Sequence, residues 1–260
     1  TIQQNMEKWC DKVALVTGGN SGIGLAAVEL LLDLQMKVIA VDKNLENLEA
    51  LKKDDKNIDN GKSENLFPIE VDLCKKQAVT KAFQWVENNL GEINLLINNA
   101  GIGGITSLVD SSPEEWKKLL DVNVVAFGRC IVETVALMRK TKTNDGLIIN
   151  ITSNLAHFVP SYPPFHFYSA TKHAARALVE GFRQEFLSLE IPIRITSISP
   201  GFVKTAIIRS SLGEDVEKFV YEKFPSICPQ DIASAIQYIL STPPDVTIRE
   251  IAIGPTGTEN

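Results

Sequence analysis

The sequence has no surplus of basic residues. It contains 26 lysines and arginines against 32 aspartates and glutamates, which gives a net charge of −6 at pH 7. A protein that binds nucleic acid needs a positively charged face for the phosphates. We therefore expect no nucleic-acid partner, and the charge balance favours partners that are neutral or small.

Metal ligands and paired cysteines are scarce as well. The four cysteines lie far apart and form no C-x-x-C pair, and none of the three histidines belongs to an H-E-x-x-H motif. Such spacing argues against a zinc site and against a dense disulfide framework. We expect no metal, and isolated reduced thiols of the kind found in cytosolic proteins.

Long hydrophobic runs are also missing. The apolar stretch Leu25 to Leu32 is interrupted by Glu29 and falls short of the length that spans a membrane. The N-terminal residues Thr1 to Lys12 are polar and lack the apolar core of a signal peptide, with Met6 as a candidate natural start. These features predict a cytoplasmic protein without a membrane span.

What the chain does contain is a regular alternation of short β-branched runs and longer helical patterns. Strands are predicted over 13–17, 37–42, 66–71, 93–98, 146–152, 193–197 and 248–253. Helices are predicted over 22–34, 45–54, 75–90, 114–139, 168–189 and 229–240. No Pro, Gly or Ser-rich linker divides the sequence, so we expect a single domain over 1–260, with an N-terminal tail (1–10) and a substrate lid (206–226).

The predicted strands are apolar on both faces. Val-Ala-Leu-Val at 13–16 and Ile-Asn-Leu-Leu-Ile at 93–97 show this pattern, which is typical of a parallel sheet covered by helices on each side. Together with the alternation, it predicts an α/β fold: a doubly wound (Rossmann) parallel sheet of about seven strands with helices on both faces.

A glycine-rich turn links the first strand to the first helix. The segment Thr17 to Gly24 follows a G-x-x-x-G-x-G spacing, not the general G-x-G-x-x-G fingerprint. Glycines let the backbone approach a pyrophosphate at a helix N-terminus, although they serve any tight turn. Asp42 ends the second strand eighteen residues after Gly24, where its carboxylate can accept hydrogen bonds from adenosine ribose hydroxyls.

Further motifs follow in order at the strand ends. They are Asn98-Asn99-Ala100-Gly101, Ser153, Tyr168-x-x-x-Lys172 and Pro200-Gly201. With the glycine turn they make the chain resemble the short-chain dehydrogenase/reductase family over nearly its whole length. Residues 167–172 and the tail Ile253-Gly254-Pro255-Thr256 most resemble the branch that holds insect farnesol dehydrogenases and a vertebrate ketosteroid reductase.

The candidate catalytic residues are Asn123, Ser153, Tyr168 and Lys172. Tyr168 and Lys172 are four residues apart and share a helix face, so the ammonium should lower the pKa of the phenol and make it an acid/base catalyst. Ser153, at the carboxyl end of the fifth strand, can hydrogen-bond the substrate oxygen. The resemblance implies that Asn123 joins the lysine to a proton-relay water; otherwise it is a surface or kink residue of its helix.

The resemblance also implies a cofactor site at the strand ends. It comprises Gly18, Asn20, Ser21, Gly22, Ile23, Gly24, Asp42, Lys43, Asp72, Leu73, Asn99, Ala100, Gly101, Tyr168, Lys172, Pro200, Gly201, Val203 and Thr205. Some of these have structural alternatives: Asn99 as a turn cap and Asp72 as a helix N-cap. His157 and His166 flank the predicted pocket, where histidines more often cap or pack than catalyse.

The cofactor is predicted to be NAD. The branch often shows adjacent arginines after the second strand, whereas this chain has Asp42-Lys43-Asn44. An aspartate repels a 2′-phosphate and accepts from a free hydroxyl. Lys43 keeps NADP open as the alternative, because it can reach a phosphate without arginine's fork.

The substrate is predicted to be a bulky apolar alcohol or ketone, such as a terpenoid, a steroid or a long-chain alcohol. Residues 155–167 are rich in rings and prolines and hold no acid, lysine or arginine, and 206–208 and 219–221 add apolar side chains. The expected activity is an NAD-dependent alcohol dehydrogenase or ketone reductase, and family resemblance implies a homodimer or homotetramer. The alternatives are an NADP-dependent carbonyl reductase, a catalytically silent dinucleotide-binding redox sensor, and a sugar-nucleotide epimerase.

Overall fold

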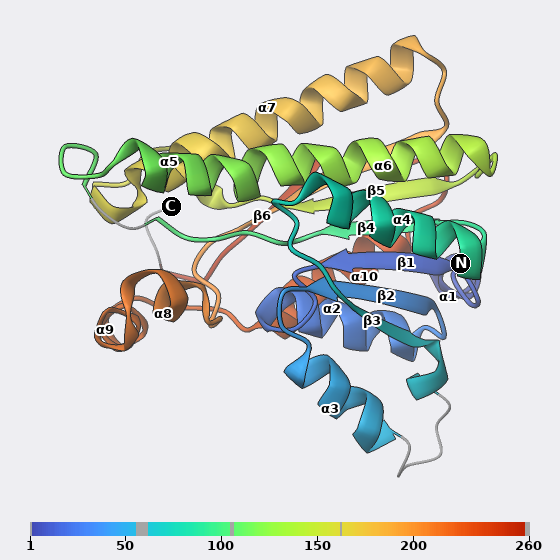
Figure 1. Cartoon of the computed structure of the whole chain (residues 1–260), viewed down its shortest axis with the longest axis horizontal. Helices are drawn as coiled ribbons and strands as arrows, with labels where there is room; N and C mark the ends of the chain where they lie inside the picture. The colour runs from blue at the N-terminus through green and yellow to red at the C-terminus, as the bar shows by residue number, and fades with distance from the viewer. Residues whose placement is uncertain (1, 56–61, 105–106, 162, 258–260) are drawn as a thin grey trace.

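A computed structural model describes residues 2–55, 62–104, 107–161 and 163–257. Over these residues seven parallel strands form one sheet in the order β3-β2-β1-β4-β5-β6-β7 (Figure 1). The strands are β1 (Val13–Thr17), β2 (Lys37–Asp42), β3 (Leu66–Glu70), β4 (Leu95–Asn98), β5 (Gly146–Ile151), β6 (Ile193–Pro200) and β7 (Glu250–Ile253). The predicted doubly wound sheet is confirmed.

Helices cover both faces of this sheet because its strands are apolar on both sides. In β1, Ala14 and Val16 pack toward α2 (Gly22–Asp33) and α10 (Pro229–Leu240), while Val13 and Leu15 pack toward α4 (Lys76–Leu90), α6 (Phe127–Lys140) and α7 (His166–Ser188). Figure 1 shows the two layers above and below the strands. Two buried cores thus fix the sheet between its helices.

Shorter elements complete the described residues. They are α1 (Ile2–Glu7), α3 (Glu46–Asp55), α5 (Pro113–Leu120), α8 (Ile207–Leu212), α9 (Glu214–Lys223) and the 3₁₀ turns η1 (Lys62–Asn65), η3 (Asn154–Ala156) and η4 (Pro163–Phe165). The strand boundaries differ slightly from those predicted. β4 begins two residues later than expected, β6 continues three residues further to Pro200, and β7 begins at Glu250.

The N-terminal stretch, expected to be a polar tail, contains α1 and packs against the domain. Trp9 is 2% exposed, and its indole Nε1 donates a 2.9 Å hydrogen bond to the carbonyl of Leu240 at the end of α10. Lys8 forms a 2.7 Å ion pair with Asp145, just before β5. The prediction of a tail rested on the polar composition of this stretch and did not consider the buried ring of Trp9, which anchors it.

The helix predicted over 114–139 is interrupted. It consists of α5, a π-helical turn η2 (Asp121–Ala126) and α6. A π turn frees backbone carbonyls from the usual ladder, and Asn98 Nδ2 at the end of β4 donates a 3.0 Å hydrogen bond to the carbonyl of Phe127, where α6 begins. The π turn carries Asn123, whose side chain is buried.

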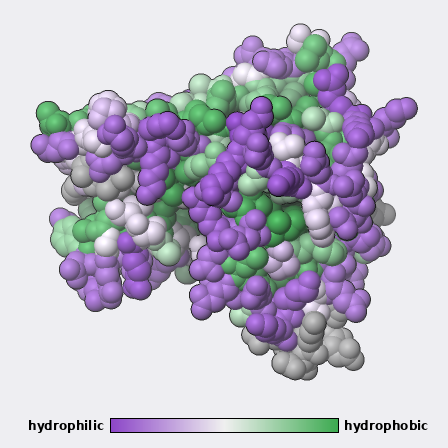
Figure 2. Space-filling view, in the orientation of Figure 1, coloured by the Kyte–Doolittle hydropathy of each residue, from purple (hydrophilic) through white to green (hydrophobic). Residues whose placement is uncertain are grey.

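The strand order reverses between β1 and β4, because the chain builds β1 to β3 outward on one side and β4 to β7 on the other. The crevice outside the carboxyl ends of strands at such a point is where open α/β sheets bind ligands. Beyond this edge stand α8 and α9, apart from the two helix layers (Figure 1). Hydrophilic residues cover most of the face in Figure 2, with hydrophobic residues showing at the α8 and α9 end, where Val216 and Phe219 are exposed.

No described helix is both long and apolar enough to cross a bilayer. In the part of the chain that the structure covers, no three histidine, cysteine or acidic side chains are grouped as metal ligands. The four cysteines are free thiols, with Cys130 buried and Cys10, Cys74 and Cys228 exposed.

Candidate active site

A cavity of about 1070 Å³ opens at the carboxyl edge of the sheet. It is bordered by the glycine turn, the ends of β2, β4, β5 and β6, the start of α7, and α8. The predicted site residues that line it are Gly18, Ser21, Gly22, Ile23, Asp42, Lys43, Leu73, Asn99, Ala100, Gly101, Ser153, Tyr168, Lys172, Pro200, Gly201, Val203 and Thr205. Asn20, Gly24, Asp72 and Asn123 lie just outside the lining.

The glycine turn packs too tightly for side chains. Gly18 and Gly22 have φ values of +66° and +52°, and a Cβ on Gly24 would lie 2.0 Å from the carbonyl oxygen of Gly18. Ser21, the N-cap of α2, makes no side-chain hydrogen bond to the helix. The first N–H groups of α2 are therefore left for an anionic ligand, as a pyrophosphate cradle requires.

Asn20 and Asp42 hold this turn against α3. Asn20 Oδ1 accepts hydrogen bonds from the backbone N–H groups of Asn47 and Leu48, at 2.9 and 3.1 Å. The Asp42 carboxylate accepts from the N–H groups of Asn20 at 3.1 Å and Lys43 at 2.7 Å. The Asn20 side chain thus serves the fold, while Asp42 borders the cavity as a fixed carboxylate.

The next two predicted residues, Lys43 and Asp72, pair with each other. Lys43 Nζ lies 3.1 Å from Asp72 Oδ1, which also accepts from the N–H of Cys74 at 3.1 Å. Burial alone would raise the pKa of Asp72, but the hydrogen bonds from Lys43 and Cys74 and the charges of Lys43 and Lys75 hold it below its ordinary value. Asp72 is not the N-cap of α4, which is Lys75, and the neighbouring Leu73 is the residue that reaches the cavity.

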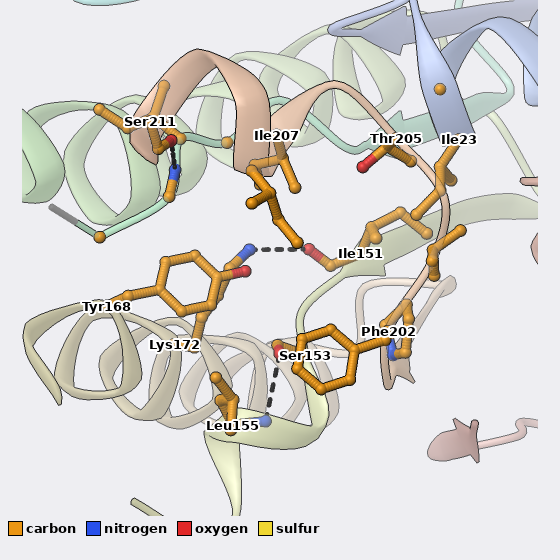
Figure 3. Close-up of a pocket in the computed structure, with 18 of the residues that line it drawn as sticks. Ile23, Ile151, Ser153, Leu155, Tyr168, Lys172, Phe202, Thr205, Ile207 and Ser211 are labelled. Carbon is orange, nitrogen blue, oxygen red and sulfur yellow. Dashed lines mark hydrogen bonds between the residues drawn. The ribbon is translucent and has the colours of Figure 1, made fainter. Parts of the chain in front are cut away.

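Tyr168, Lys172 and Ser153 converge on the middle of the cavity (Figure 3). Lys172 Nζ lies 5.6 Å from the centroid of the Tyr168 ring and donates a 3.3 Å hydrogen bond to the carbonyl of Ile151. The Ser153 hydroxyl is close enough to the Tyr168 phenol to lower its pKa, and its Oγ accepts from the N–H of Leu155 at 3.1 Å, capping η3. A helix and a strand end thus present a phenol, an ammonium and a hydroxyl to one space.

The expected electrostatics of this pair are only partly present. Burial raises the pKa of Tyr168 to about 12, outweighing the hydrogen bond from Ser153, and burial lowers the pKa of Lys172 to about 8. The sequence predicts that the ammonium lowers the pKa of the phenol. Protein surrounds both groups, however, and desolvation of the phenolate dominates. The phenol is therefore the stable form at neutral pH.

Asn123 lies behind the cavity and is 1% exposed. Its Nδ2 donates to the carbonyl of Ile102 at 2.9 Å and to Thr171 Oγ1 at 3.1 Å, and its Oδ1 accepts from the N–H of Ile102 at 2.9 Å. A Cβ on Gly101 would lie 3.4 Å from Asn123 Oδ1 and 3.6 Å from Lys172 Nζ. The amide thus ties the π turn to the β4 loop and to α7, close to the lysine. Sequence reasoning missed Ile102 and Thr171 because no motif marks their contacts.

The outer half of the cavity is apolar. Leu155, Phe158, Val159 and Phe165 line it from one side, and Phe202, Ala206, Ile207 and Ile208 from the other. The residues 219–221, expected in this wall, are not part of it: Phe219 is 53% exposed and Val220 is buried within the lid. Tyr162, also in the predicted wall, lies outside the described residues.

Two hydrogen-bonding side chains that no motif signals hold the segment 206–226 in place. Tyr221 Oη contacts the carbonyl of Val203 at 2.8 Å and accepts from the N–H of Thr205 at 3.0 Å. Ser211 Oγ accepts from the N–H of Gly103 at 3.1 Å (Figure 3). The lid is thus docked on both the β6 end and the β4 loop.

The comparisons with known proteins agree with this architecture. The family model described as short chain dehydrogenase matches residues 12–215. Dehydrogenase/reductase SDR family member 11 from Bos taurus is 39% identical over 253 residues, 96% of this chain and 98% of that protein. Farnesol dehydrogenase from Aedes aegypti is 35% identical, over 97% of this chain and 99% of that protein.

Solved structures also resemble the chain, in their fold. An alcohol dehydrogenase from the archaeon Thermococcus sibiricus, complexed with 5-hydroxy-NADP, has a TM-score of 0.81 at 26% identity and covers 96% of this chain and 98% of its own. A serine dehydrogenase complexed with NADP⁺ has a TM-score of 0.82 at 25% identity, with 93% and 94% coverage. The resemblance drawn from the motifs is confirmed.

Proposed function

The chain belongs to the short-chain dehydrogenase family of oxidoreductases, and we propose that it transfers a hydride between NAD and a bulky, largely apolar alcohol or ketone. One observation carries the proposal: Ser153, Tyr168 and Lys172 share a cavity with the glycine turn at the N-terminus of α2. A cradle for a dinucleotide and an acid/base group for an alcohol therefore open into the same space.

The residues present fit a nicotinamide dinucleotide. Turn glycines that admit no Cβ and the uncapped start of α2 suit its pyrophosphate, and Asp42 suits a ribose. When bound, the nicotinamide ring supplies or accepts the hydride. Tyr168 gives its phenolic proton to the substrate oxygen in reduction and takes it back in oxidation, while Ser153 hydrogen-bonds that oxygen. Lys172 stabilises the phenolate and would hold the nicotinamide ribose when the dinucleotide is bound.

Two observations support NAD over NADP. The Asp42 carboxylate is fixed by backbone hydrogen bonds at the mouth of the cavity, where its charge opposes a 2′-phosphate. Lys43, the next residue along the chain, is engaged with Asp72. We therefore expect a higher kcat/KM with NAD. Asp42→Ala combined with Lys43→Arg should move the preference toward NADP by about tenfold, because the repulsion goes and a bidentate partner appears.

The apolar outer half supports the substrate class. Phe158, Phe165, Phe202 and Ile207 offer a surface that binds by burial of apolar area. The relative named farnesol dehydrogenase carries an apolar alcohol in its name, which agrees with this proposal. Secondary and allylic alcohols of terpenoid, steroid or long-chain type are the compounds to test.

The buried phenol also suggests a pH dependence. Because burial raises the pKa of Tyr168 to about 12, the proton needed for ketone reduction is in place at neutral pH. Oxidation needs the phenolate, whose fraction grows as pH rises toward that value. The ratio of oxidation to reduction rates should therefore increase with pH.

A four-way assay tests the function. The chain is incubated with NAD or NADP and a panel of apolar alcohols, hydroxy acids and sugars, and with NADH or NADPH and the matching ketones, while reduced dinucleotide is followed by absorbance. The expected result is turnover of apolar alcohols or ketones, faster with the NAD pair. Dinucleotide binding without turnover would instead favour a redox sensor. Because epimerisation produces no net change in reduced dinucleotide, UDP-sugars are incubated separately with NAD and their products analysed; their conversion would favour an epimerase.

Assembly and compartment are part of the proposal. Val125, Val132, Leu178 and Leu187 are exposed on η2, α6 and α7, the faces through which family members associate, and they support a homodimer or homotetramer. Four free thiols support a reducing compartment such as the cytoplasm.

A further inference from the structure

One carboxylate on the edge strand β7 gathers polar contacts from three other segments. Glu250 Oε1 lies 2.7 Å from His157 Nε2 and accepts a 2.6 Å hydrogen bond from Ser199 Oγ. Its Oε2 lies 3.5 Å from Arg176 Nε. The Glu250 side chain is 25% exposed, so these contacts are partly shielded from water. We call these four residues the Glu250 cluster.

Two members of the cluster continue directly into the catalytic strand end. His157 follows the 3₁₀ turn η3, whose N-cap is Ser153. Ser199 Oγ lies 2.8 Å from Thr152 Oγ1, next to Ser153. A carboxylate only accepts hydrogen bonds, so Ser199 donates to Glu250. The single hydroxyl proton of Thr152 points to the carbonyl of Ile198, 2.9 Å away, or to Ser199 Oγ. Close polar contacts therefore link the residue beside Ser153 to Ser199 and Glu250.

The third partner lies on the catalytic helix. Arg176 comes four residues after Lys172 on α7, and therefore one turn further along the helix. Ser199, in turn, directly precedes Pro200 and Gly201, which line the cavity. Glu250 thus contacts the end of the turn η3 that Ser153 caps, the β6 end and α7. The catalytic hydroxyl, the cavity wall and the Tyr–Lys pair belong to these three segments.

The Glu250 carboxylate keeps its charge at ordinary pH. Burial alone would raise the pKa of Glu250, but the hydrogen bonds from Ser199 and His157 and the charges of His157 and Arg176 outweigh burial and hold that pKa below its ordinary value. Among the described residues, His157 and Arg176 are the charged groups that pair with this carboxylate.

We propose that Glu250 is a positioning residue of the active site, which holds Ser153 and the Tyr168–Lys172 pair in register through His157, Ser199 and Arg176. The inference rests on the proposed function, because its readout is turnover. A displacement of about 1 Å in catalytic groups costs up to about a hundredfold in rate. Loosening the cluster should therefore lower kcat more than dinucleotide affinity.

A second paired carboxylate, at the amino end of β5, offers a matched control. Asp145, just before β5, pairs with Lys8 at 2.7 Å and with Arg194 at 2.9 Å, and its side chain is 31% exposed. Burial would raise its pKa too, and its hydrogen bonds and cations lower it. Asp145 is thus a carboxylate of similar burial and pairing whose partner on β6, Arg194, lies at the start of that strand and not at its cavity end.

The test compares Glu250→Gln, Glu250→Ala and Asp145→Asn by kcat per dinucleotide-binding site, by KM for dinucleotide and by Tm. We expect kcat to fall about tenfold in Glu250→Gln and about a hundredfold in Glu250→Ala, with little change in dinucleotide KM. Asp145→Asn should lower Tm and keep the wild-type kcat. Equal kcat values in the Glu250 and Asp145 variants would overturn the inference and leave the proposed function standing.

His157→Gln supplies a second test that keeps Glu250, Ser199 and Arg176 in place. It removes the imidazole that lies 2.7 Å from Glu250 Oε1, so kcat should fall while the KM for dinucleotide stays constant. A wild-type kcat in this variant contradicts the role of the pair. A wild-type chain that turns over no alcohol or ketone would overturn the proposed function, and this inference with it.

Discussion

The two halves of the cavity are built by different means. Around the glycine turn, backbone groups do the work: Gly24 packs against the carbonyl of Gly18, and the Asp42 carboxylate accepts three backbone N–H groups. On the substrate side, α8 and α9 dock through side chains, chiefly Tyr221 and Ser211. The first arrangement admits almost no substitution, whereas the second tolerates changes of side-chain size.

This difference separates two kinds of specificity. A turn held by backbone contacts presents the same N–H groups to every dinucleotide, so a change there should affect all alcohol substrates equally. A wall of separate apolar side chains recognises its ligand by the area that each side chain buries. A change there should alter the ranking of substrates and spare the dinucleotide.

The largest effect is expected where the halves meet. Tyr168→Phe keeps the ring and removes the proton that the reaction transfers, so kcat/KM should fall about a thousandfold for every substrate, with dinucleotide affinity nearly unchanged. Steady-state kinetics and fluorescence titration with NADH measure the two quantities. Tyr238→Phe, on the exposed face of α10 at 61% exposure, is the control and should behave as wild type. Retention of substantial activity by the Tyr168 variant would remove the phenol from the mechanism.

A smaller effect is expected in the glycine turn. Gly24→Ala would bring a Cβ within 2.0 Å of the Gly18 carbonyl, and the turn must shift. Overpacking of this kind costs about 2 kcal/mol, so affinity for the dinucleotide should fall about thirtyfold, by one factor whichever alcohol is present. Isothermal titration measures it.

Gly181→Ala provides the comparison for that substitution. It lies on exposed α7 with no atom within 4 Å of the new Cβ, and it should stabilise the helix by about 1 kcal/mol while leaving dinucleotide binding unchanged. If the Gly24 variant binds the dinucleotide as tightly as the Gly181 variant, the turn is more compliant than its packing indicates, and the contrast between the two halves fails.

The sequence predicts those parts of the molecule that depend on local contacts and misses those that depend on distant ones. Strands, the glycine turn and the Tyr–Lys spacing depend on neighbours close in the chain, and the sequence predicts them. By contrast, the bond from Asn98 to the Phe127 carbonyl, just after the π turn, joins residues 29 positions apart, and the contact of His157 with Glu250 joins residues 93 positions apart. The Asn123 contacts to Ile102 and Thr171 are also set by tertiary packing. No local pattern encodes these contacts, so only the structure reveals them.

The lid shows most clearly what the sequence pattern does not predict. Residues 219–221 have the apolar pattern of a pocket wall, and the sequence alone places all three against the substrate. In the structure Tyr221 turns its hydroxyl to the Val203–Thr205 backbone, and Phe219 points outward. Amphipathic periodicity indicates which residues share a helix face, but it does not indicate whether that face meets a ligand or another loop.

The smallest effect is predicted at the substrate wall, where it separates substrate recognition from dinucleotide recognition. Ile207 lies on α8 and borders the cavity opposite Tyr168 (Figure 3). Ile207→Ala removes apolar area worth about 0.8 kcal/mol per buried CH₂, and because Ile207 is only partly buried we expect about a fivefold loss of kcat/KM for long apolar alcohols. Short alcohols, which do not reach α8, should lose little, and the KM for dinucleotide should stay constant.

Val216→Ala, on the exposed part of α9, controls for lid stability. An alcohol series of increasing chain length measures the slope of kcat/KM against length: it should flatten in Ile207→Ala and stay unchanged in Val216→Ala. An equal loss for all chain lengths would mean that α8 acts on the dinucleotide. Dinucleotide recognition and substrate recognition would then not belong to separate halves of the cavity.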